Sequence, residues 1–352
     1  MDLNKLGWNE TLEAKFQEYK AIGFVAGRVF IEHKNIYRVY TESGEILAEI
    51  SGRMRHDAVE GKDYPSVGDW VIVEPWKNEQ KGSIHGILPR KSKFSRKVAG
   101  DNTREQILAS NVDIVFLVNA LNKDFNMRRI ERYLVLAFES GASPVIILSK
   151  ADLCEDIDEK LNEVSKFAMG VPIHVVSSIK SEGVDYLKKY LVEGKTVALL
   201  GSSGAGKSTL INELAGCELQ RTGDIRDGDD KGKHTTTHRE LMILPGGGLI
   251  IDTPGMRELQ MWDGGQGISE TFEDIEQLSK QCKFTDCKHK EEPGCAVNEA
   301  LAQGNLSEER LQSYIKLQKE ILYFIRKQDQ VAMLNEKRKW KNINKEIRKR
   351  NK

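Results

Sequence analysis

The first 90 residues contain five short runs in which apolar and polar side chains alternate. The runs span residues 24–31, 36–41, 45–50, 69–75 and 83–89, and turn-forming residues such as Pro65 and Gly68 lie between them. A period of two is typical of strands that bury one face. Five such strands over about 65 residues predict a small β-barrel of the oligonucleotide-binding (OB) type, and we expect residues 1–98 to form an RNA-binding domain around it. A barrel with a purely structural role is the alternative.

From about residue 105 the pattern changes to apolar runs that alternate with stretches of helical spacing. Residues 112–120 form a largely apolar run, residues 127–141 have apolar positions at helical spacing, and residues 144–148 are apolar again. Such alternation predicts a parallel sheet covered by helices, with ligands bound at the carboxyl ends of the strands. We therefore predict an α/β domain over residues 99–268, with its chemistry in the loops that follow the strands.

The last part of the chain, residues 269–352, is predicted to be mainly helical. Residues 307–325 have apolar positions at helical spacing. Residues 337–352 hold nine Lys or Arg and a single acid, Glu346. This charge density and Trp340 favour ribosomal RNA as the partner of the basic segment. A solvated helix is the alternative.

Composition narrows the class of protein without naming its activity. The chain has 352 residues, of which 39% are hydrophobic and 30% charged, with a formal net charge of zero. No run approaches the roughly 18 apolar residues that span a bilayer, and the N-terminus does not resemble a secretory signal. We expect a cytoplasmic monomer that does not associate with membranes. In that reducing compartment the five cysteines are not expected to form disulfides.

A second basic segment follows the predicted barrel. In the sequence RKSKFSRK, Arg90 to Lys97, basic residues flank Phe94. Such interleaving suits contact with a nucleic-acid backbone and stacking of the ring on a base. A solvated loop fits the same residues.

The strongest local motif is GSSGAGKST, Gly201 to Thr209, which follows an apolar strand and opens a helix. This arrangement predicts a phosphate-binding loop whose N–H groups face the phosphates. Lys207 is expected to reach the β- and γ-phosphates, and Ser208 to bind Mg²⁺. The residues of this loop expected to contact the nucleotide are Gly201, Ser202, Ser203, Gly204, Ala205, Gly206, Lys207, Ser208 and Thr209.

A base-reading motif precedes that loop. In SKAD, Ser149 to Asp152, the carboxylate of Asp152 is expected to accept two hydrogen bonds from guanine, a donor pair that adenine lacks. Lys150 would lie along the base and ribose, Ala151 is expected among the nucleotide-contacting residues, and the Ser149 hydroxyl would replace the usual Asn or Thr. Ser177 and Ser178 are expected in the loop that closes over the base. NKDF, residues 122–125, lacks a terminal Asp and is set aside.

A second acidic loop completes the predicted nucleotide site. Asp252 ends an apolar strand, as the metal-shell aspartate of such sites does, and Gly255 offers an N–H to the γ-phosphate. In ordinary GTPases the phosphate loop precedes the base-reading motif, whereas here Ser149–Asp152 comes first. Because strand ends meet at one edge of a parallel sheet, a permuted order preserves the pocket.

Four soft metal ligands lie close together in the C-terminal part. Cys282, Cys287, His289 and Cys295 fall within fourteen residues, which predicts a closed structural zinc site. With four protein ligands, no position remains for catalysis, and the ion is expected to fold a segment too small for its own core.

Taken together, the motifs resemble the ribosome small-subunit-dependent GTPase A family. The resemblance rests on VGDWV, ILPRKS, SKAD, GSSGAGKST, GKHTTTHRE, DTPG and the Cys/His cluster, and it covers nearly the whole chain. It implies an OB barrel, a circularly permuted GTPase domain and a zinc domain. It also implies a factor that binds the small ribosomal subunit late in maturation and hydrolyses GTP faster on the subunit. Ser149 departs from the commoner Asn.

Catalysis raises a separate question, because Met256 stands where many GTPases have a water-orienting Gln. We hypothesise that His234 supplies this function and that Thr236 completes the Mg²⁺ shell, and we count Lys207, which reaches the β- and γ-phosphates, among the catalytic residues. Two other classes stay open at this point: an ATP-using phosphate-loop enzyme, and an RNA-binding protein that holds nucleotide without turnover.

Overall fold

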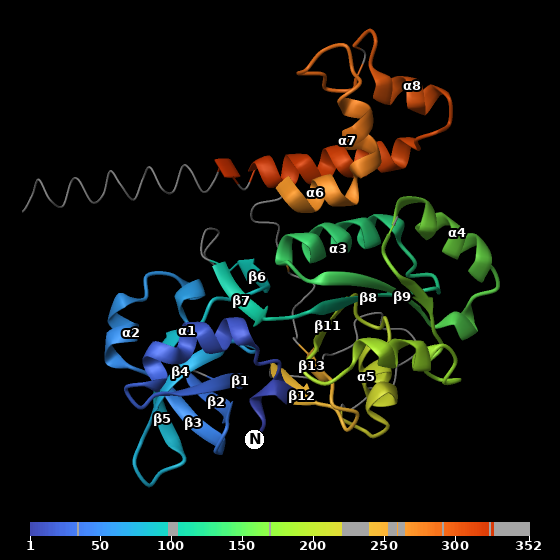
Figure 1. The fold of residues 1–352 in the computed structure, drawn as a ribbon. Coiled ribbons are helices and arrows are strands. Elements are labelled where there is room, and N and C mark those ends of the chain that lie inside the picture. Colours follow the sequence, from blue (N-terminus) through green and yellow to red (C-terminus); the bar gives the residue numbers. More distant parts are fainter. Residues whose placement is uncertain are drawn as a thin grey trace, which may run out of the picture. The chain divides into compact units, whose positions relative to one another are not determined.

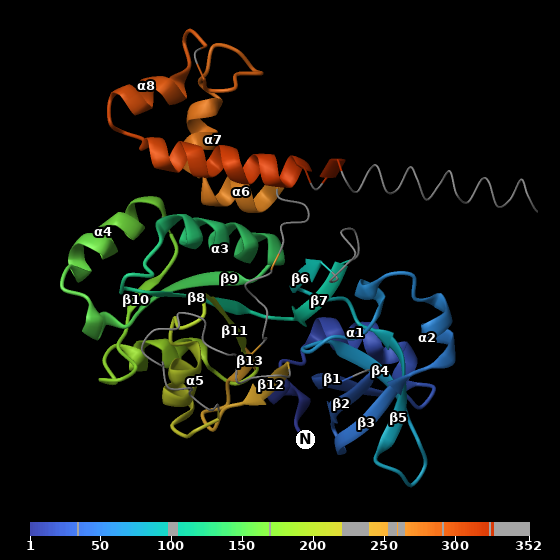
Figure 2. The same cartoon turned by 180° about the vertical axis from the view of Figure 1, so that it is seen from behind.

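The computed structural model describes most of the chain (Figures 1 and 2). The described residues are 1–33, 35–97, 105–168, 170–219, 239–252, 259, 265–290, 292–323 and 325–326. Contacts divide the chain into two compact units. The first comprises residues 1–96 and 105–260, and the second residues 97–104 and 261–352. The predicted basic segment at residues 337–352 lies outside the described residues.

The N-terminal part of the first unit is a closed five-stranded barrel of the OB type. Its strands are β1 (Val25–His33), β2 (Ile36–Thr41), β3 (Gly44–Ile50), β4 (Trp70–Pro75) and β5 (Lys81–Ile87). Pairing runs β1–β2–β3–β5–β4 and returns from β4 to β1, so the ring is complete. Alternate side chains of these strands, including Val29, Val39 and Val71, fill the interior. The predicted barrel is thus confirmed.

Short helices accompany the barrel strands. They are η1 (Leu3–Leu6), α1 (Glu10–Lys20), α2 (Gly52–Asp57) and η2 (Gly61–Asp63). The side chain of Asn9 accepts a hydrogen bond from the N–H of Leu12 and caps α1, and Ser51 caps α2 in the same way through Met54. Leu12 and Phe16, one turn apart, form the buried face of α1.

The segment RKSKFSRK forms part of a two-stranded sheet, which corrects the expectation of an RNA-contacting or solvated loop. Strand β6 (Lys93–Lys97) pairs with β7 (Glu105–Ser110). Phe94 is only 2% exposed, so its ring cannot stack on a base. Lys93 pairs with Glu105 at 2.9 Å, and Arg90 binds the carboxylate of Asp69. Lys93 and Arg90 are thus paired within the fold, and the expected stacking of Phe94 on a base was wrong.

The α/β part of the first unit is a six-stranded sheet in the order β10–β9–β8–β11–β13–β12. Its strands are β8 (Ile114–Ala120), β9 (Ser143–Ser149), β10 (Ile173–Val175), β11 (Thr196–Gly201), β12 (Glu240–Ile243) and β13 (Leu249–Asp252). Strands β8 to β11 and β13 are parallel, and β12 runs antiparallel to β13. The predicted parallel sheet is present, with one antiparallel strand at the end next to the barrel.

Helices cover both faces of this sheet. They include α3 (Met127–Ser140), η3 (Ala151–Leu153), α4 (Ile157–Phe167), η4 (Val184–Tyr190) and α5 (Lys207–Ala215). In both ribbon views α3 lies on one face and α5 on the other. Leu210, Ile211 and Leu214 of α5 pack with Phe116 and Val118 of β8 in one core. Asn126 directly precedes α3 and caps it, because its side chain accepts a hydrogen bond from the N–H of Arg129.

The barrel and the α/β sheet are directly joined. Ile31 of β1 pairs with Glu240 of β12, so the strands of both parts form one continuous set. The buried guanidinium of Arg28 donates to the carbonyls of Leu6, Gly68 and Asn111, and Asn111 lies between β7 and β8. Arg239, the residue before β12, pairs with Glu32 at 3.5 Å. The pairing of β1 with β12, the hydrogen bonds of the buried Arg28 and the Arg239–Glu32 ion pair thus hold the barrel and the α/β sheet together.

The second unit is helical in its described residues. It contains α6 (Gly265–Thr271), α7 (Glu273–Ser279), α8 (Ala296–Ala302) and a helix at residues 308–323. Arg310 on the last helix donates to both carboxylate oxygens of Asp274 at 2.7 Å and lies over the ring of Phe272. The predicted amphipathic helix is present and buries Leu311, Tyr314, Leu317 and Ile321. No helix among the described residues has the length and apolar character that crossing a membrane requires.

Candidate nucleotide site and metal centre

The phosphate-binding loop connects β11 to α5. Gly201 ends β11 so close to β8 that a Cβ there would lie 2.4 Å from the carbonyl oxygen of Val118. Gly206 has a φ of 88° and directly precedes the first residue of α5. A side chain is excluded by contact at the first position and is strained by the backbone at the second. The two glycines thus permit the tight strand-to-helix turn that phosphate loops require.

Lys207 folds back over its own loop. Its Nζ donates to the carbonyl oxygen of Gly201 at 2.9 Å and to that of Ser202 at 2.7 Å. The ammonium group thus lies across the mouth of the loop, at the amino end of α5. A short swing of this flexible side chain takes the charge from these carbonyls to phosphate oxygens, so the position suits the predicted role.

The base-reading segment is tied to the phosphate loop through Ser149. This serine is 3% exposed at the end of β9, and its Oγ donates to the carbonyl oxygen of Ala205 at 2.7 Å. The hydroxyl expected to replace the usual Asn side chain therefore makes a structural bond between the two motifs, although 56 residues separate them in sequence. Lys150 then adopts a left-handed backbone with φ of 57°.

Asp152 is oriented by the loop that follows β10. One oxygen of its carboxylate accepts a hydrogen bond from Ser177 Oγ at 2.6 Å. The N–H of Ala151 donates to the carbonyl of Val176 at 3.1 Å, which connects the same two loops through the backbone. Ser178 follows Ser177 directly. The structure thus brings the two predicted base-contacting segments side by side, next to the strand whose end is tied to the phosphate loop.

The second acidic loop is only partly described. Asp252 ends β13, which pairs in parallel with β11, so both loops leave the same edge of the sheet. On its other side Asp252 lies opposite Glu240 of β12. Gly255, His234, Thr236 and Met256 lie outside the described residues. The predicted site residues that the structure does describe, from Ser149 to Asp252, therefore cluster at the carboxyl ends of β9, β10, β11 and β13.

Sequence reasoning missed one side chain at this site. Asp124, within the segment NKDF that was set aside, accepts a hydrogen bond from Ser202 Oγ at 2.7 Å. The loop that carries it follows β8, the neighbour of β11 in the sheet. The position of Asp124 in the loop after a buried strand could have identified it, because loops at the carboxyl ends of adjacent parallel strands lie close together.

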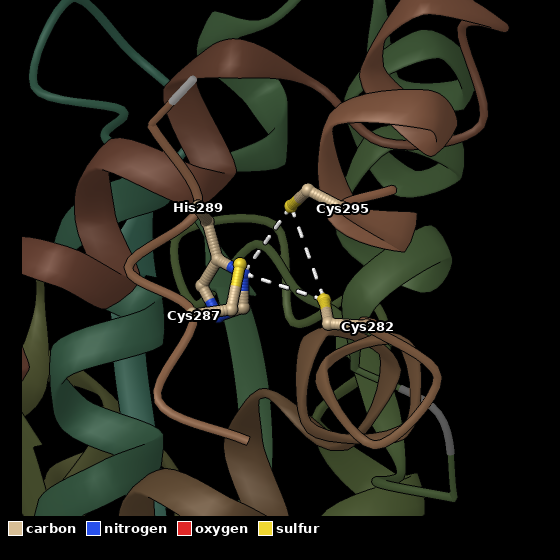
Figure 3. A group of neighbouring side chains, drawn as sticks. All are labelled: Cys282, Cys287, His289 and Cys295. Carbon is tan, nitrogen blue, oxygen red and sulfur yellow. Dashed lines mark hydrogen bonds between the residues drawn. The ribbon is translucent and has the colours of Figure 1, made fainter. Parts of the chain in front are cut away.

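The predicted metal ligands converge in the second unit. The side chains of Cys282, Cys287, His289 and Cys295 point toward one centre (Figure 3), and their ligand atoms all lie within 4.8 Å of one another. Cys282 Sγ lies 3.9 Å from Cys295 Sγ and 3.7 Å from His289 Nδ1, and the latter is 3.5 Å from Cys295 Sγ. Zn–S and Zn–N bonds of about 2.3 and 2.0 Å give tetrahedral edges of roughly 3.5–3.8 Å. The cluster therefore fits a metal ion in size and donor set.

Outer contacts hold the imidazole in place. His289 Nε2 lies 3.1 Å from Ser279 Oγ, whose hydroxyl donates to the carbonyl of Ile275 within α7. Such a contact on the second ring nitrogen fixes the tautomer that leaves Nδ1 free to bind a metal. Cys295 directly precedes α8, and Cys282 follows α7, so the ion would link these two helices.

Comparisons with known proteins agree on one family. The sequence model of a family described as RsgA GTPase matches residues 87–262, and a second model, described as 50S ribosome-binding GTPase, matches residues 196–351. A protein of Opitutus terrae named small ribosomal subunit biogenesis GTPase RsgA is 45% identical and aligns with 97% of this chain and 96% of its own length. A protein of Oceanobacillus iheyensis named small ribosomal subunit biogenesis GTPase RsgA 1 is 48% identical, with 90% of each chain covered.

Solved structures show the same architecture. YjeQ from Thermotoga maritima superposes with a TM-score of 0.63 at 30% identity, covering 85% of this chain and 99% of that one. YloQ, described as a circularly permuted GTPase, gives a TM-score of 0.61 at 25% identity, covering 85% and 95%. The shared fold agrees with the rearranged order of motifs along this chain.

Proposed function

This chain belongs to the RsgA GTPase family, and we propose that it hydrolyses GTP to GDP and phosphate during biogenesis of the small ribosomal subunit. The observation that carries the proposal is the bond from Ser149 Oγ to the Ala205 carbonyl. It joins a base-reading segment to a phosphate loop that comes after it in sequence. The names of relatives more than 40% identical over most of the chain supply the ribosomal context.

We propose the following roles for the site residues. Asp152, held by Ser177, accepts hydrogen bonds from guanine and rejects adenine. Lys207 leaves the carbonyls of Gly201 and Ser202 to bind the β- and γ-phosphates. The N–H groups of the loop and the amino end of α5 surround the phosphates.

Magnesium is the metal that this chemistry requires, and bound Mg²⁺ neutralises charge on the β- and γ-phosphates. We propose Ser208 and Thr236 as its ligands, with Asp252 at the edge of its shell and Gly255 donating an N–H to the γ-phosphate. His234 is proposed to orient the attacking water in place of a Gln. Replacing His234 with Ala is expected to abolish subunit-stimulated hydrolysis while GTP still binds.

Zinc is the ion we propose for the Cys/His cluster. Three thiolates and one imidazole at tetrahedral spacing suit Zn²⁺ better than the hard ions Mg²⁺ and Ca²⁺, which prefer oxygen. With all four positions supplied by the protein, the ion is structural and stabilises the loop between α7 and α8.

We propose that small-subunit rRNA is the macromolecular partner. The supporting features are the OB-type barrel, an architecture that accommodates oligonucleotides, and the nine basic residues at positions 337–352. Such a partner places the protein in the cytoplasm.

One assay tests the proposal. Phosphate release from GTP and from ATP is measured for the full chain alone, with purified small subunits and with purified large subunits as the matched control. We expect slow turnover of GTP alone, a large stimulation by small subunits only, and no ATP turnover. A preference for ATP would identify an ATP-using enzyme. Nucleotide binding without turnover on either subunit would identify an RNA-binding protein that merely holds nucleotide.

A further inference from the structure

The loop after β8 reaches the phosphate loop through a carboxylate. Asp124 Oδ2 accepts a hydrogen bond from Ser202 Oγ at 2.7 Å, and 78 residues separate the two in sequence. Ser202 is the first residue after Gly201, so this contact holds the start of the turn. The Ser149–Ala205 bond holds its end. The turn from Ser202 to Ala205 is therefore fixed at both ends by side chains of neighbouring loops.

Asp124 is itself held by Arg129 and by Asn122. Arg129 on α3 donates to Oδ2 at 2.7 Å and to Oδ1 at 3.0 Å, a two-point geometry. The N–H of Asp124 donates to Asn122 Oδ1 at 3.0 Å, which closes the turn of this loop. Asn126 then caps α3 and fixes the start of the helix that carries Arg129.

A carboxylate beside a phosphate site needs a physical reason, because it repels the ligand. Here the Arg129 guanidinium is the main cause that holds the pKa of Asp124 below its usual range, and the Ser202 hydroxyl acts in the same direction. The pair is close to neutral as a whole. It can therefore anchor Ser202 with the strength of a charged acceptor while adding little net charge near the phosphates.

We propose that Asp124 is a positioning residue of the nucleotide site, which holds the phosphate loop in its binding conformation through Ser202 and is itself oriented by Arg129. The inference rests on the proposed nucleotide site. Lys207 must leave the carbonyls of Gly201 and Ser202 when a nucleotide binds, and those carbonyls then lose a cation. The Asp124–Ser202 bond does not involve the carbonyls, so it persists and keeps the loop from following Lys207.

A double-mutant cycle tests this coupling. The dissociation constants of GDP and of a non-hydrolysable GTP analogue are measured for the full chain as wild type, Ser202→Ala, Asp124→Ala and the double variant. We expect Ser202→Ala to weaken both nucleotides about tenfold, as loss of a hydrogen bond to a charged group implies. Asp124→Ala is expected to weaken binding in the wild-type background and to have no further effect once Ser202 has been replaced.

The competing explanation is that Asp124 acts only through its charge. In that case Asp124→Ala changes affinity by the same factor in both backgrounds, and this result overturns the proposal. Unchanged binding by Ser202→Ala overturns it as well. Failure of the wild type to bind guanine nucleotides would instead refute the proposed site as a whole, so the two failures are distinguishable.

Three controls separate positioning from damage to the fold. Ser202→Thr keeps the hydroxyl and is expected to restore affinity to within about twofold of wild type. Ser165→Ala removes a hydroxyl that donates to a backbone carbonyl on the exposed helix α4, away from the site, and is expected to leave affinity unchanged. When the rate is measured over a range of GTP concentrations, Ser202→Ala is expected to raise KM about tenfold with kcat within about twofold. An equal loss in kcat would show that the tie acts in the transition state and would contradict a role in ground-state binding.

Discussion

Replacing Arg28 with Lys offers a quantitative test of how the barrel is joined to the α/β sheet. The guanidinium is fully buried and donates from Nε to the Gly68 carbonyl at 3.3 Å, from Nη2 to the Asn111 carbonyl at 3.1 Å, and from Nη1 to the Leu6 carbonyl. These carbonyls belong to three separate segments. A compact ammonium group lacks the planar fork that spans them.

The magnitude follows from burial and from hydrogen bonds. Burial lowers the pKa of Arg28 from 12.5 to about 10, in spite of the attraction of Asp113 and Asp69. This corresponds to a cost of about 3 kcal/mol for the buried charge, which the three hydrogen bonds offset. Lysine carries a similar cost with about two hydrogen bonds fewer. We expect Arg28→Lys to lower the free energy of unfolding by about 2–3 kcal/mol at pH 7.

The variant should also gain a pH dependence. The same burial would lower the pKa of a lysine at this position in the folded chain, below its value of about 10.4 in the unfolded chain. Between these two pKa values the unfolded state binds more protons, so stability rises with pH. Arg28 keeps its proton in this range up to about pH 10, and the wild type lacks this contribution. The loss in the variant should therefore shrink as the pH rises toward about 10.

Urea unfolding followed by tryptophan fluorescence provides the assay, because the Trp70 ring lies 5.5 Å from the guanidinium. Wild type and Arg28→Lys are compared at pH 7, 8 and 9, so that titration of other groups cancels in the difference. Arg53→Lys, on an exposed side chain of α2, is the matched control and should change stability by less than about 0.5 kcal/mol. Equal stability of wild type and Arg28→Lys at pH 7, or a difference that does not change with pH, would refute the reasoning.

Three further predictions concern the site, the metal centre and strand β6. Ser177→Ala removes a 2.6 Å hydrogen bond to Asp152 and should weaken GDP binding about tenfold. ADP binding, measured by the same titration method, should stay as weak as in the wild type. Cys295→Ser should lower the amount of zinc found by metal analysis of the purified chain and reduce its helical circular dichroism signal. A zinc content equal to that of the wild type would contradict the assignment. Phe94→Ala should lower the free energy of unfolding by about 3–5 kcal/mol because the ring is buried, and loss of RNA affinity with unchanged stability would contradict its core position.

The architecture followed from sequence where the pattern is local and repeated. Alternation of apolar and polar residues predicted the five barrel strands closely, since each strand buries one face in the same interior. The Cys/His ligands were predictable for a similar reason, because Cys282 to Cys295 lie within a single short loop. The phosphate loop combined a local glycine pattern with a preceding apolar strand.

The contacts that assemble the site were harder to predict because they are distant in sequence. The partner of Ser149 is a backbone carbonyl 56 residues away, and the partner of Asp124 is a serine 78 residues away. The segment NKDF failed as a base-reading motif, yet its Asp124 faces the nucleotide loop. Residue type and spacing cannot rank such pairs until strand order in the sheet is known.

The basic segment around Phe94 shows that local composition can also suggest a contact that the fold does not support. Its composition suited RNA contact, but Arg90, Lys91 and Lys93 pair with acids within the fold, namely Asp69, Asp113 and Glu105. Local charge counts did not reveal these partners, because they come from the turn before β4, from the residue before β8 and from β7. A buried aromatic between basic residues is therefore compatible with an ordinary strand whose edges carry ion pairs.

Strand β12 pairs with a barrel strand, β1, on one side and with a strand of the α/β sheet, β13, on the other. Glu240 stands opposite Ile31 of the barrel on one side and opposite Asp252, at the edge of the nucleotide site, on the other. One residue thus separates Asp252 from a barrel strand, with no linker between them to absorb a displacement. If the barrel is clamped on a rigid surface, β12 is immobilised with it, and Asp252 is held in turn through its pairing with Glu240.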